Sequence, residues 1–136
     1  MQAIRYRRGV DASTGRIITG QVHLAQSIAT IWATRIGERV MLLAFGSNLR
    51  SHLGEDVTGA LALQIYDDLT TAIIRWEPEY RMIDFQLVSL TRKGGMGIRH
   101  GGVYYPEGRF GNRTITERFG TVTDLAPYEG LARRAA

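Results

Sequence analysis

Apolar residues recur at helical spacing in two stretches of the chain. In the first stretch they lie four, three and one residues apart, which predicts a helix from about Val22 to Thr34. The positions that carry this pattern are Leu24, Ile28, Ile31 and Trp32. Gly37 fits the C-cap of this helix, because glycine adopts a positive φ without strain.

The second stretch has the clearer stripe and predicts a helix from about Val57 to Trp76. Its apolar positions follow at steps of mostly four residues: Leu61, Ile65, Leu69, Ile73 and Trp76. Asp56 or Thr58 can cap the start of the helix. Pro78 ends it, because the residue before a proline is biased away from helical angles.

The remaining apolar runs are short and predict extended segments. Arg39–Phe45 is expected to be a brief strand or an extended buried segment. Three strands are expected at Tyr80–Leu90, at Ile98–Tyr105 with a break at its two glycines, and at Asn112–Val122, the first two joined by a turn at Lys93–Gly97. This order predicts an α+β fold in which two main helices pack on a small antiparallel sheet of about three strands.

The length of 136 residues fits one domain, 1–136, with flexible tails at about 1–16 and 123–136. The chain has no cysteine, which removes disulfide and thiol chemistry. It has no apolar run near 18 residues, so no membrane-spanning helix is expected.

The net charge of +4 comes almost entirely from arginine, since Lys93 is the one lysine. Arginine suits phosphates, carboxylates and aromatic faces, so this composition fits nucleic acid and protein interfaces equally well. Outside the C-terminal pair, the arginines cluster at Arg5, Arg7 and Arg8 and are otherwise spread along the chain. A nucleic-acid footprint is normally denser.

Few residues fit the usual catalytic or metal-binding patterns. His23, His52 and His100 do not stand at metal-ligand spacing, so neither a metal nor another cofactor is expected. A glycoside hydrolase needs two carboxylates across a cleft. Asp67 and Asp68 fit the solvated face of the second helix better than such a pair.

Glu77 is the exception, because it stands at the corner between the second helix and the strand that follows. A carboxylate at a helix C-terminus opposes the helix dipole, so it needs a compensating partner. Arg39, Arg75 and Arg81 are the expected partners within the chain. The alternatives are a contact with another protein and a catalytic acid whose pKa is raised by apolar surroundings.

The segment "QSIATIWATRIGERVMLLAFGSNL", followed by a long helix that ends in "WEPEYR", resembles a known family. This is the baseplate wedge and sheath-initiator family of contractile phage tails, which has relatives in type VI secretion baseplates and is often labelled lysozyme-like. The resemblance covers about Ile17 to Leu90. The matching residues are Gln26-Ser27-Ile28, Thr34, Gly37-Glu38-Arg39, Phe45-Gly46-Ser47 and Glu77-Pro78.

The resemblance implies a Glu-Pro-Arg motif that contacts larger wedge subunits. Here the third position is Glu79, and the nearest later arginine is Arg81. The residues expected at the wedge interface are Glu77, Pro78, Arg81 and Arg39. The residues expected to have structural roles are Trp76, Gly37, Glu38, Phe45 and Gly46.

The resemblance also implies nucleation of the tail sheath, in which a free sheet edge pairs with a strand of the first sheath ring. The candidate strand is Asn112, Arg113, Thr114, Ile115, Thr116, Glu117, Arg118 and Phe119. The implied partners are larger wedge subunits, the sheath protein, and hub or tube proteins, in a virion tail baseplate assembled in the host cytoplasm. No membrane, small-molecule substrate or catalytic residue is expected. A cell-wall hydrolase and an arginine-driven nucleic-acid-binding module remain the alternatives.

Overall fold

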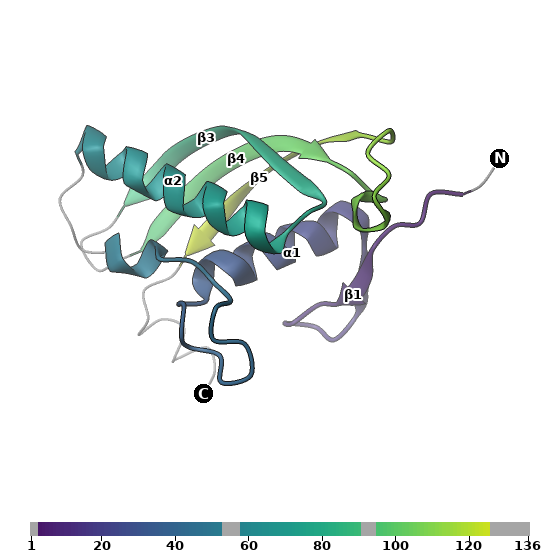
Figure 1. Cartoon of the computed structure of the whole chain (residues 1–136), viewed down its shortest axis with the longest axis horizontal. Coiled ribbons are helices and arrows are strands. Elements are labelled where there is room, and N and C mark those ends of the chain that lie inside the picture. The colour runs from purple at the N-terminus through teal and green to yellow at the C-terminus, as the bar shows by residue number, and fades with distance from the viewer. Residues whose placement is uncertain (1–2, 53–57, 91–94, 126–136) are drawn as a thin grey trace.

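The computed structural model describes residues 3–52, 58–90 and 95–125, and it confirms the predicted α+β class (Figure 1). Helices α1 (Gly20–Ala33) and α2 (Gly59–Trp76) cover one face of an antiparallel sheet with strand order β3–β4–β5. None of the described helices is long and apolar enough to cross a membrane. The strands and short helices are β1 (Arg8–Val10), β2 (Ile17–Thr19), η1 (Leu49–His52), β3 (Tyr80–Leu90), β4 (Met96–Tyr104), η2 (Gly108–Phe110) and β5 (Glu117–Leu125).

The stripe predicted for α1 faces the core, and its four apolar residues are at most 2% exposed. Trp32 lies at the centre and donates from its indole nitrogen to the Leu69 carbonyl of α2 at 3.3 Å. Burying one such side chain stabilises the fold by about 1.5–3 kcal/mol. The predicted C-cap was wrong, because Thr34 is the C-cap and Gly37 turns the chain three residues later with φ +91°.

Helix α2 begins after Thr58, whose side-chain oxygen accepts from the Leu61 N–H at 3.1 Å. The other predicted cap, Asp56, lies outside the described residues. The helix ends at Trp76, as the proline two residues later requires. Trp76 is half-buried and packs edge-on against Phe45, with ring centroids 5.2 Å apart.

The sheet is regular on one side and irregular on the other. Strand β5 pairs with β4 without a shift in register, whereas the pairing of β3 with β4 shifts between Met82 and Asp84 and again between Leu87 and Ser89. Strand β4 continues through its two glycines, so the predicted break was wrong. A side chain at Gly102 would come within 1.9 Å of the Arg81 carbonyl oxygen, and glycine therefore permits the first irregularity. Most of the predicted turn at Lys93–Gly97 lies outside the described residues.

Three further predictions need correction. Residues 8–10, within the predicted N-terminal tail, form β1 and pair with β2. The third strand begins at Glu117 rather than at Asn112, because the Asn112 side-chain oxygen accepts from the backbone N–H and hydroxyl of Thr114, which favours a turn. Residues 123–125, within the predicted C-terminal tail, complete β5.

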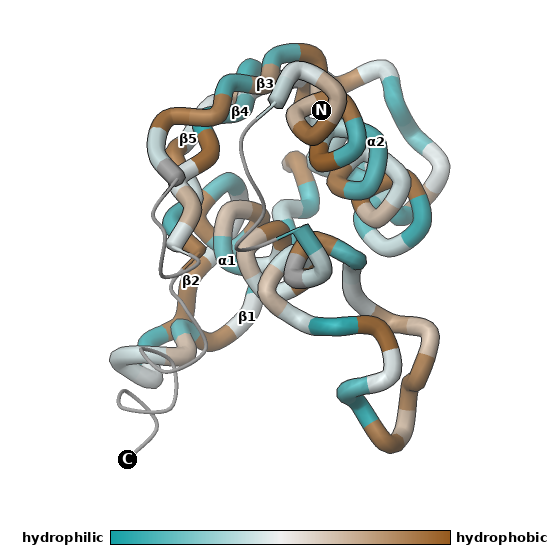
Figure 2. Tube along the Cα trace, turned by 90° about the vertical axis from the view of Figure 1, so that its left-hand side faces the viewer, coloured by the Kyte–Doolittle hydropathy of each residue, from teal (hydrophilic) through white to brown (hydrophobic). Residues whose placement is uncertain are grey.

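The run Arg39–Phe45 is not a strand, and most of its side chains are exposed. It belongs to a loop of consecutive turns between α1 and η1, which projects below the two helices in Figures 1 and 2. Val40 is 87% exposed and Met41 is 95% exposed. The apolar residues of this run predicted burial, but the structure exposes Val40, Met41, Leu42 and Leu43, while Phe45 is partly buried against Trp76.

Candidate functional site

The corner between α2 and β3 buries the carboxylate of Glu77, which is 4% exposed. Its Oε1 lies 2.7 Å from Nη1 of Arg7, and its Oε2 accepts from the Ser27 hydroxyl at 2.7 Å. The partner arginine is therefore Arg7, and none of the three arginines expected from the sequence. Pro78, the next residue, is exposed at the surface of the corner.

Arg7 reaches the corner because the N-terminal segment runs beside α1. Its Nε donates to Nδ1 of His23 at 2.7 Å. Burial lowers the pKa of His23 and the charge of Arg7 lowers it further, while Glu77 opposes part of this change. A neutral His23 can accept the hydrogen bond from Arg7, so the three side chains form one connected group.

Glu79, at the position where the family motif has arginine, is also buried and also pairs within the chain. Nη1 of Arg109 donates to Oε1 of Glu79 at 3.0 Å, and Nη2 of Arg109 donates to the Arg5 carbonyl at 2.8 Å. Arg5 in turn donates to Glu107 at 2.9 Å, a hydrogen bond that lowers the pKa of Glu107. We call Arg5, Arg7, Glu77, Glu79, Glu107 and Arg109 the ionic corner.

The exposed residues expected at the wedge interface lie around this corner. Pro78 and Arg81 are exposed, while the Arg39 guanidinium lies over the Phe45 ring, 4.1 Å from its centroid. Phe45 in turn contacts Trp76 at the end of α2. The structure thus brings Arg39 to the helix end through two aromatic rings, although it does not pair with Glu77.

The residues expected to be structural hold the turns of the exposed loop. The Glu38 carboxylate accepts from the Arg35 N–H at 2.8 Å, which closes the first turn. Gly46 has φ +120°, and a side chain there would lie 2.3 Å from the Thr34 carbonyl oxygen. That carbonyl instead accepts from the Ser47 N–H at 2.9 Å, so the close approach at Gly46 ties the two ends of the loop together.

His100 is a buried polar residue to which the sequence assigned no structural role. Tyr80 from β3 and Thr123 from β5 each lie at hydrogen-bond distance, 3.0 Å, from one of its ring nitrogens. Trp32 packs edge-on against the imidazole, with ring centroids 4.6 Å apart. Burial lowers the pKa of His100 to about 4, so the ring is neutral near pH 7 and joins all three strands to α1.

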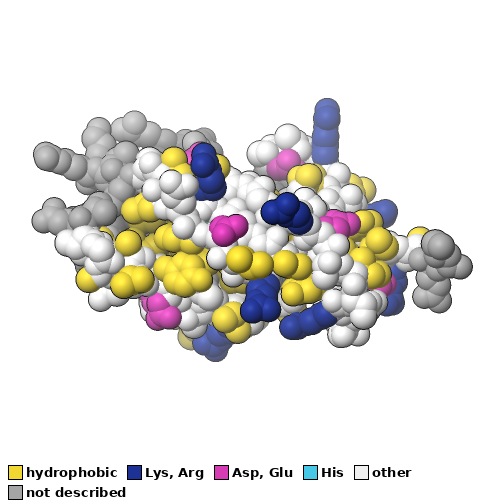
Figure 3. Space-filling model, turned by 90° about the horizontal axis from the view of Figure 1, so that it is seen from above, with side chains coloured by type: hydrophobic (Ala, Val, Ile, Leu, Met, Phe, Trp, Pro, Cys, Tyr) yellow, Lys and Arg dark blue, Asp and Glu magenta, His cyan; other side chains and the backbone are white. Residues whose placement is uncertain are grey.

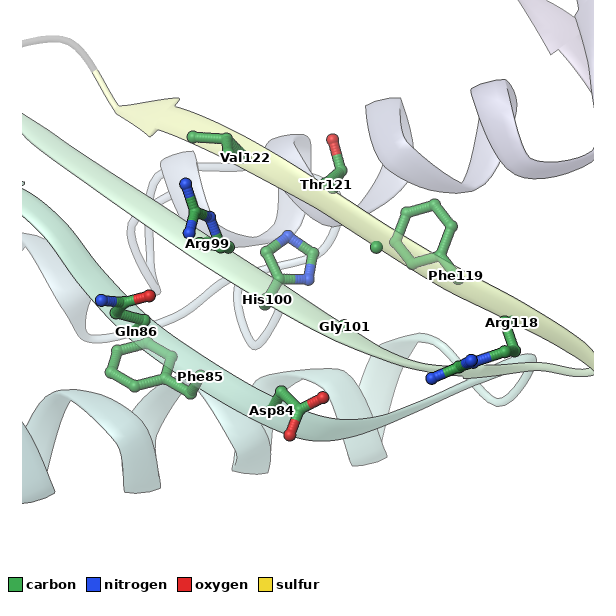
Figure 4. Close-up of a pocket in the computed structure, with 11 residues that line it drawn as sticks. Asp84, Phe85, Gln86, Arg99, His100, Gly101, Arg118, Phe119, Thr121 and Val122 are labelled. Atoms are coloured by element: carbon green, nitrogen blue, oxygen red, sulfur yellow. The ribbon is translucent and has the colours of Figure 1, made fainter.

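The outer face of the sheet, opposite the helices, carries an open groove of about 800 Å³ (Figure 4). Gly101 of β4 pairs with Gly120 of β5. Because neither residue has a side chain, the groove is deeper at this point. Arg99, Arg118 and Asp84 stand around it. Charged side chains of both signs lie scattered among hydrophobic ones in Figure 3, so this face does not form the dense basic patch that a nucleic-acid footprint requires.

The geometry does not favour hydrolysis. Both oxygens of Glu77 have partners within the chain, and the side chain is nearly inaccessible. The open groove is lined by one carboxylate, Asp84, whereas glycoside hydrolysis uses two. Among the residues that the structure describes, no group of three or more His, Asp or Glu side chains is placed to hold a metal ion.

The free edge of β5 is the second candidate site. The side-chain nitrogen of Gln21 donates to the Arg118 carbonyl at 3.0 Å, so this carbonyl points away from β4. Backbone groups alternate in direction along a strand, and those of Gly120, Val122 and Asp124 therefore point the same way. Within the described part of the chain, these groups have no backbone partner along the free edge.

The chain resembles known proteins in sequence. The family model described as baseplate wedge protein gp25 matches residues 19–95. Baseplate protein W of Escherichia phage P2 is 40% identical over 70 residues, which are 52% of this chain and 61% of that protein. The match therefore spans less than two thirds of the length of this relative.

Three solved structures share the fold. A putative tail lysozyme from Geobacter sulfurreducens is 25% identical, with a TM-score of 0.58 over 79% of this chain and 92% of its own. A chain of the postcontracted pyocin R2 baseplate is 19% identical, with a TM-score of 0.56 over 88% of this chain and 100% of its own. A chain of the anti-feeding prophage baseplate is 19% identical, with a TM-score of 0.52 over 93% of this chain and 87% of its own.

Proposed function

This chain belongs to the baseplate wedge protein gp25 family and is a structural component of a contractile-tail baseplate; from that premise we propose that it joins larger wedge subunits and nucleates the tail sheath. The observation that carries the nucleation proposal is the free edge of β5. A strand from the first sheath ring would pair with this edge and extend the sheet by β-augmentation.

The two edge strands of the sheet, β3 and β5, differ in how well they can pair with a strand of another chain. Strand β5 pairs with β4 in one unbroken register from Glu117 to Leu125, so its outward backbone groups recur at a regular spacing. Strand β3 has two register shifts, which twist an edge and discourage pairing. The β5 edge is therefore the one that we assign to the sheath. Of the eight residues predicted for this contact, Glu117, Arg118 and Phe119 lie in β5.

The wedge contact that we propose uses the exposed side of the corner. Pro78 and Arg81 are exposed there, and Arg39 reaches the same helix end through Phe45. Glu77 acts from inside, because its pairing with Arg7 fixes the corner from which the exposed side chains project. Hub or tube proteins would be further neighbours in the assembled baseplate.

A single substitution can block the β5 edge without removing the strand. Val122→Pro removes an outward N–H, at a position where an edge strand tolerates proline. Val122→Ala keeps the N–H and is the matched control. Baseplates that carry Val122→Pro should assemble but bear few sheaths in electron micrographs, while the alanine control should bear normal sheaths. Normal sheaths on the proline variant would contradict the proposal.

The role that we propose is structural rather than catalytic. Purified wild-type chain should leave the turbidity of a peptidoglycan suspension unchanged, because the Glu77 carboxylate is closed off within the fold. A fall in turbidity that Glu77→Gln abolishes would instead assign a hydrolase activity to this glutamate.

A further inference from the structure

The exposed loop at residues 36–43, which we call the apolar loop, places five large hydrophobic side chains in solvent. Their exposed fractions range from 44% to 95%, for Ile36, Val40, Met41, Leu42 and Leu43. Figure 2 shows the hydrophobic segments of this loop projecting beyond the body of the domain. A contiguous apolar surface of this kind marks an interaction site, whereas scattered single residues do not.

The apolar loop has a defined conformation stabilised by its own backbone. The Gly37 N–H donates to the Leu43 carbonyl at 2.7 Å and closes the loop, and the Leu42 N–H donates to the Arg39 carbonyl at 3.2 Å within it. Its base is tied by the bond from the Ser47 N–H to the Thr34 carbonyl. Because these bonds already order the loop, a partner that covers it gains affinity without a large ordering cost.

The charges that rim the apolar loop are mainly positive. Arg35, Arg39 and Arg75 are exposed around it. The nearby carboxylates are engaged: Glu38 accepts from the Arg35 backbone, and Asp68 pairs with His52. A complementary partner must therefore offer an apolar surface with carboxylates around it.

The shape beside the loop gives a second point of contact. A small hollow of about 70 Å³ separates the loop from the C-terminal half of α2, with Ile36, Ala44, Arg75 and Trp76 among its lining residues. The loop is convex and the hollow adjoins it. A partner can therefore receive the loop in a cleft and insert a side chain of its own into the hollow.

We propose that the apolar loop docks into an apolar cleft rimmed by carboxylates on a larger wedge subunit, an inference that rests on the proposed wedge-joining function. Continuity of surface supports this partner, because Phe45 at the base of the loop packs on Trp76 at the corner. A second copy of this chain fits less well, since a symmetric contact would bring the same positively charged rim of both copies together.

The test uses the full chain with the large wedge subunits of its own tail locus. Val40→Ser/Met41→Ser removes apolar surface from the loop, and Val22→Ser/Leu63→Ser removes similarly exposed apolar side chains from α1 and α2 as a control. Affinity is measured by isothermal titration calorimetry on the purified partners. The loop variant should bind at least about tenfold more weakly, while the control should stay within about twofold.

Substitutions of Arg39 test independently whether the partner carries carboxylates around its cleft. Arg39→Glu should weaken binding further, because it sets a negative charge against the carboxylates that we infer, whereas Arg39→Lys should retain most of the affinity. Equal affinities for the two variants would overturn the inference about the chemistry of the partner. Circular dichroism checks that each variant keeps the fold.

The remaining outcomes separate the inference from the proposed function. If the wild-type chain and the loop variant bind the wedge subunits equally well, the docking inference is wrong and wedge joining stands. If the wild-type chain does not bind them, both are wrong. Loop-dependent dimers in light scattering would assign the loop to a second copy. Loop-dependent binding to phosphatidylglycerol vesicles, absent with phosphatidylcholine, would assign it to a membrane; either result without wedge binding overturns the inference.

Discussion

The ionic corner and the apolar loop arrange their residues in opposite ways. The corner buries the carboxylates of its three glutamates, and each of them has an arginine partner within the chain. The loop leaves five hydrophobic side chains between 44% and 95% exposed within the described chain. A buried charge that is paired needs no further partner. Covering exposed apolar surface with another molecule, by contrast, lowers the free energy of the system. The buried pairs of the corner therefore contribute stability, whereas we infer that the loop, together with the exposed side of the corner, serves assembly.

The largest effect is expected when the corner is broken. Glu77→Ala leaves Arg7 mostly buried and without its carboxylate, which should lower the free energy of unfolding by about 3–5 kcal/mol in urea denaturation. Glu38→Ala, at an exposed carboxylate, is the control and should cost below about 1 kcal/mol. Equal small losses for the two variants would show that the buried pair does not stabilise the corner.

His100 extends the comparison to a buried group that is neutral. Its folded-state pKa of about 4 lies below the ordinary value of 6.5, so the unfolded chain binds more protons between these values. Stability should therefore be complete above about pH 6.5 and fall by about 3 kcal/mol as the pH drops toward 4. Denaturation at a series of pH values measures this slope, and His100→Gln should flatten it. An unchanged slope in that variant would assign the pH dependence to other groups.

The loop can be tested at its base. Gly46→Ala would place a side chain at a positive φ and against the Thr34 carbonyl oxygen, so it should lower the free energy of unfolding by about 2 kcal/mol. Gly37 also has a positive φ, but the space around it is open, so Gly37→Ala should lower the free energy of unfolding by about 1 kcal/mol. Thermal unfolding of the two variants measures the difference. A smaller loss for Gly46→Ala than for Gly37→Ala would contradict the close approach that ties the loop.

The smallest effect is expected at the tip of the loop. Met41→Ser should change the free energy of unfolding by less than about 0.5 kcal/mol, because the side chain is 95% exposed. The same denaturation assay measures it. A clear loss of stability would mean that the tip packs within this chain, and the contrast between loop and corner would disappear.

The sequence predicted what depends on local periodicity. Both helices, the strand at Tyr80–Leu90 and the burial of Trp32 follow from spacing within a short window. The partner of Glu77 could not be predicted in this way, because Arg7 reaches it only after the chain has folded α1 between them. The cluster of arginines near the N-terminus was the available signal, and it suggested surface charge rather than a buried pair.

The sequence-based predictions were wrong at one exposed loop and at the start of one strand. The run around Val40 has the composition of a buried strand. A hydrophobic sequence alone does not distinguish burial in the fold from burial against a partner. The third strand began later than predicted because Asn112 forms a turn through its own side chain. The sequence already made this strand the candidate sheath contact, but which of its backbone groups point outward could be assigned only from the orientation of the Arg118 carbonyl.

Amide hydrogen exchange measures directly whether a sheath strand pairs with the β5 edge. In the free chain the outward amides of Gly120, Val122 and Asp124 should exchange quickly, whereas the Glu77 amide, bonded to the Ile73 carbonyl at 2.8 Å, should exchange slowly. In sheath-bearing particles the three β5 amides should become protected, and the Glu77 amide should not change. Unaltered exchange at the β5 amides in those particles would show that the sheath does not pair with this edge.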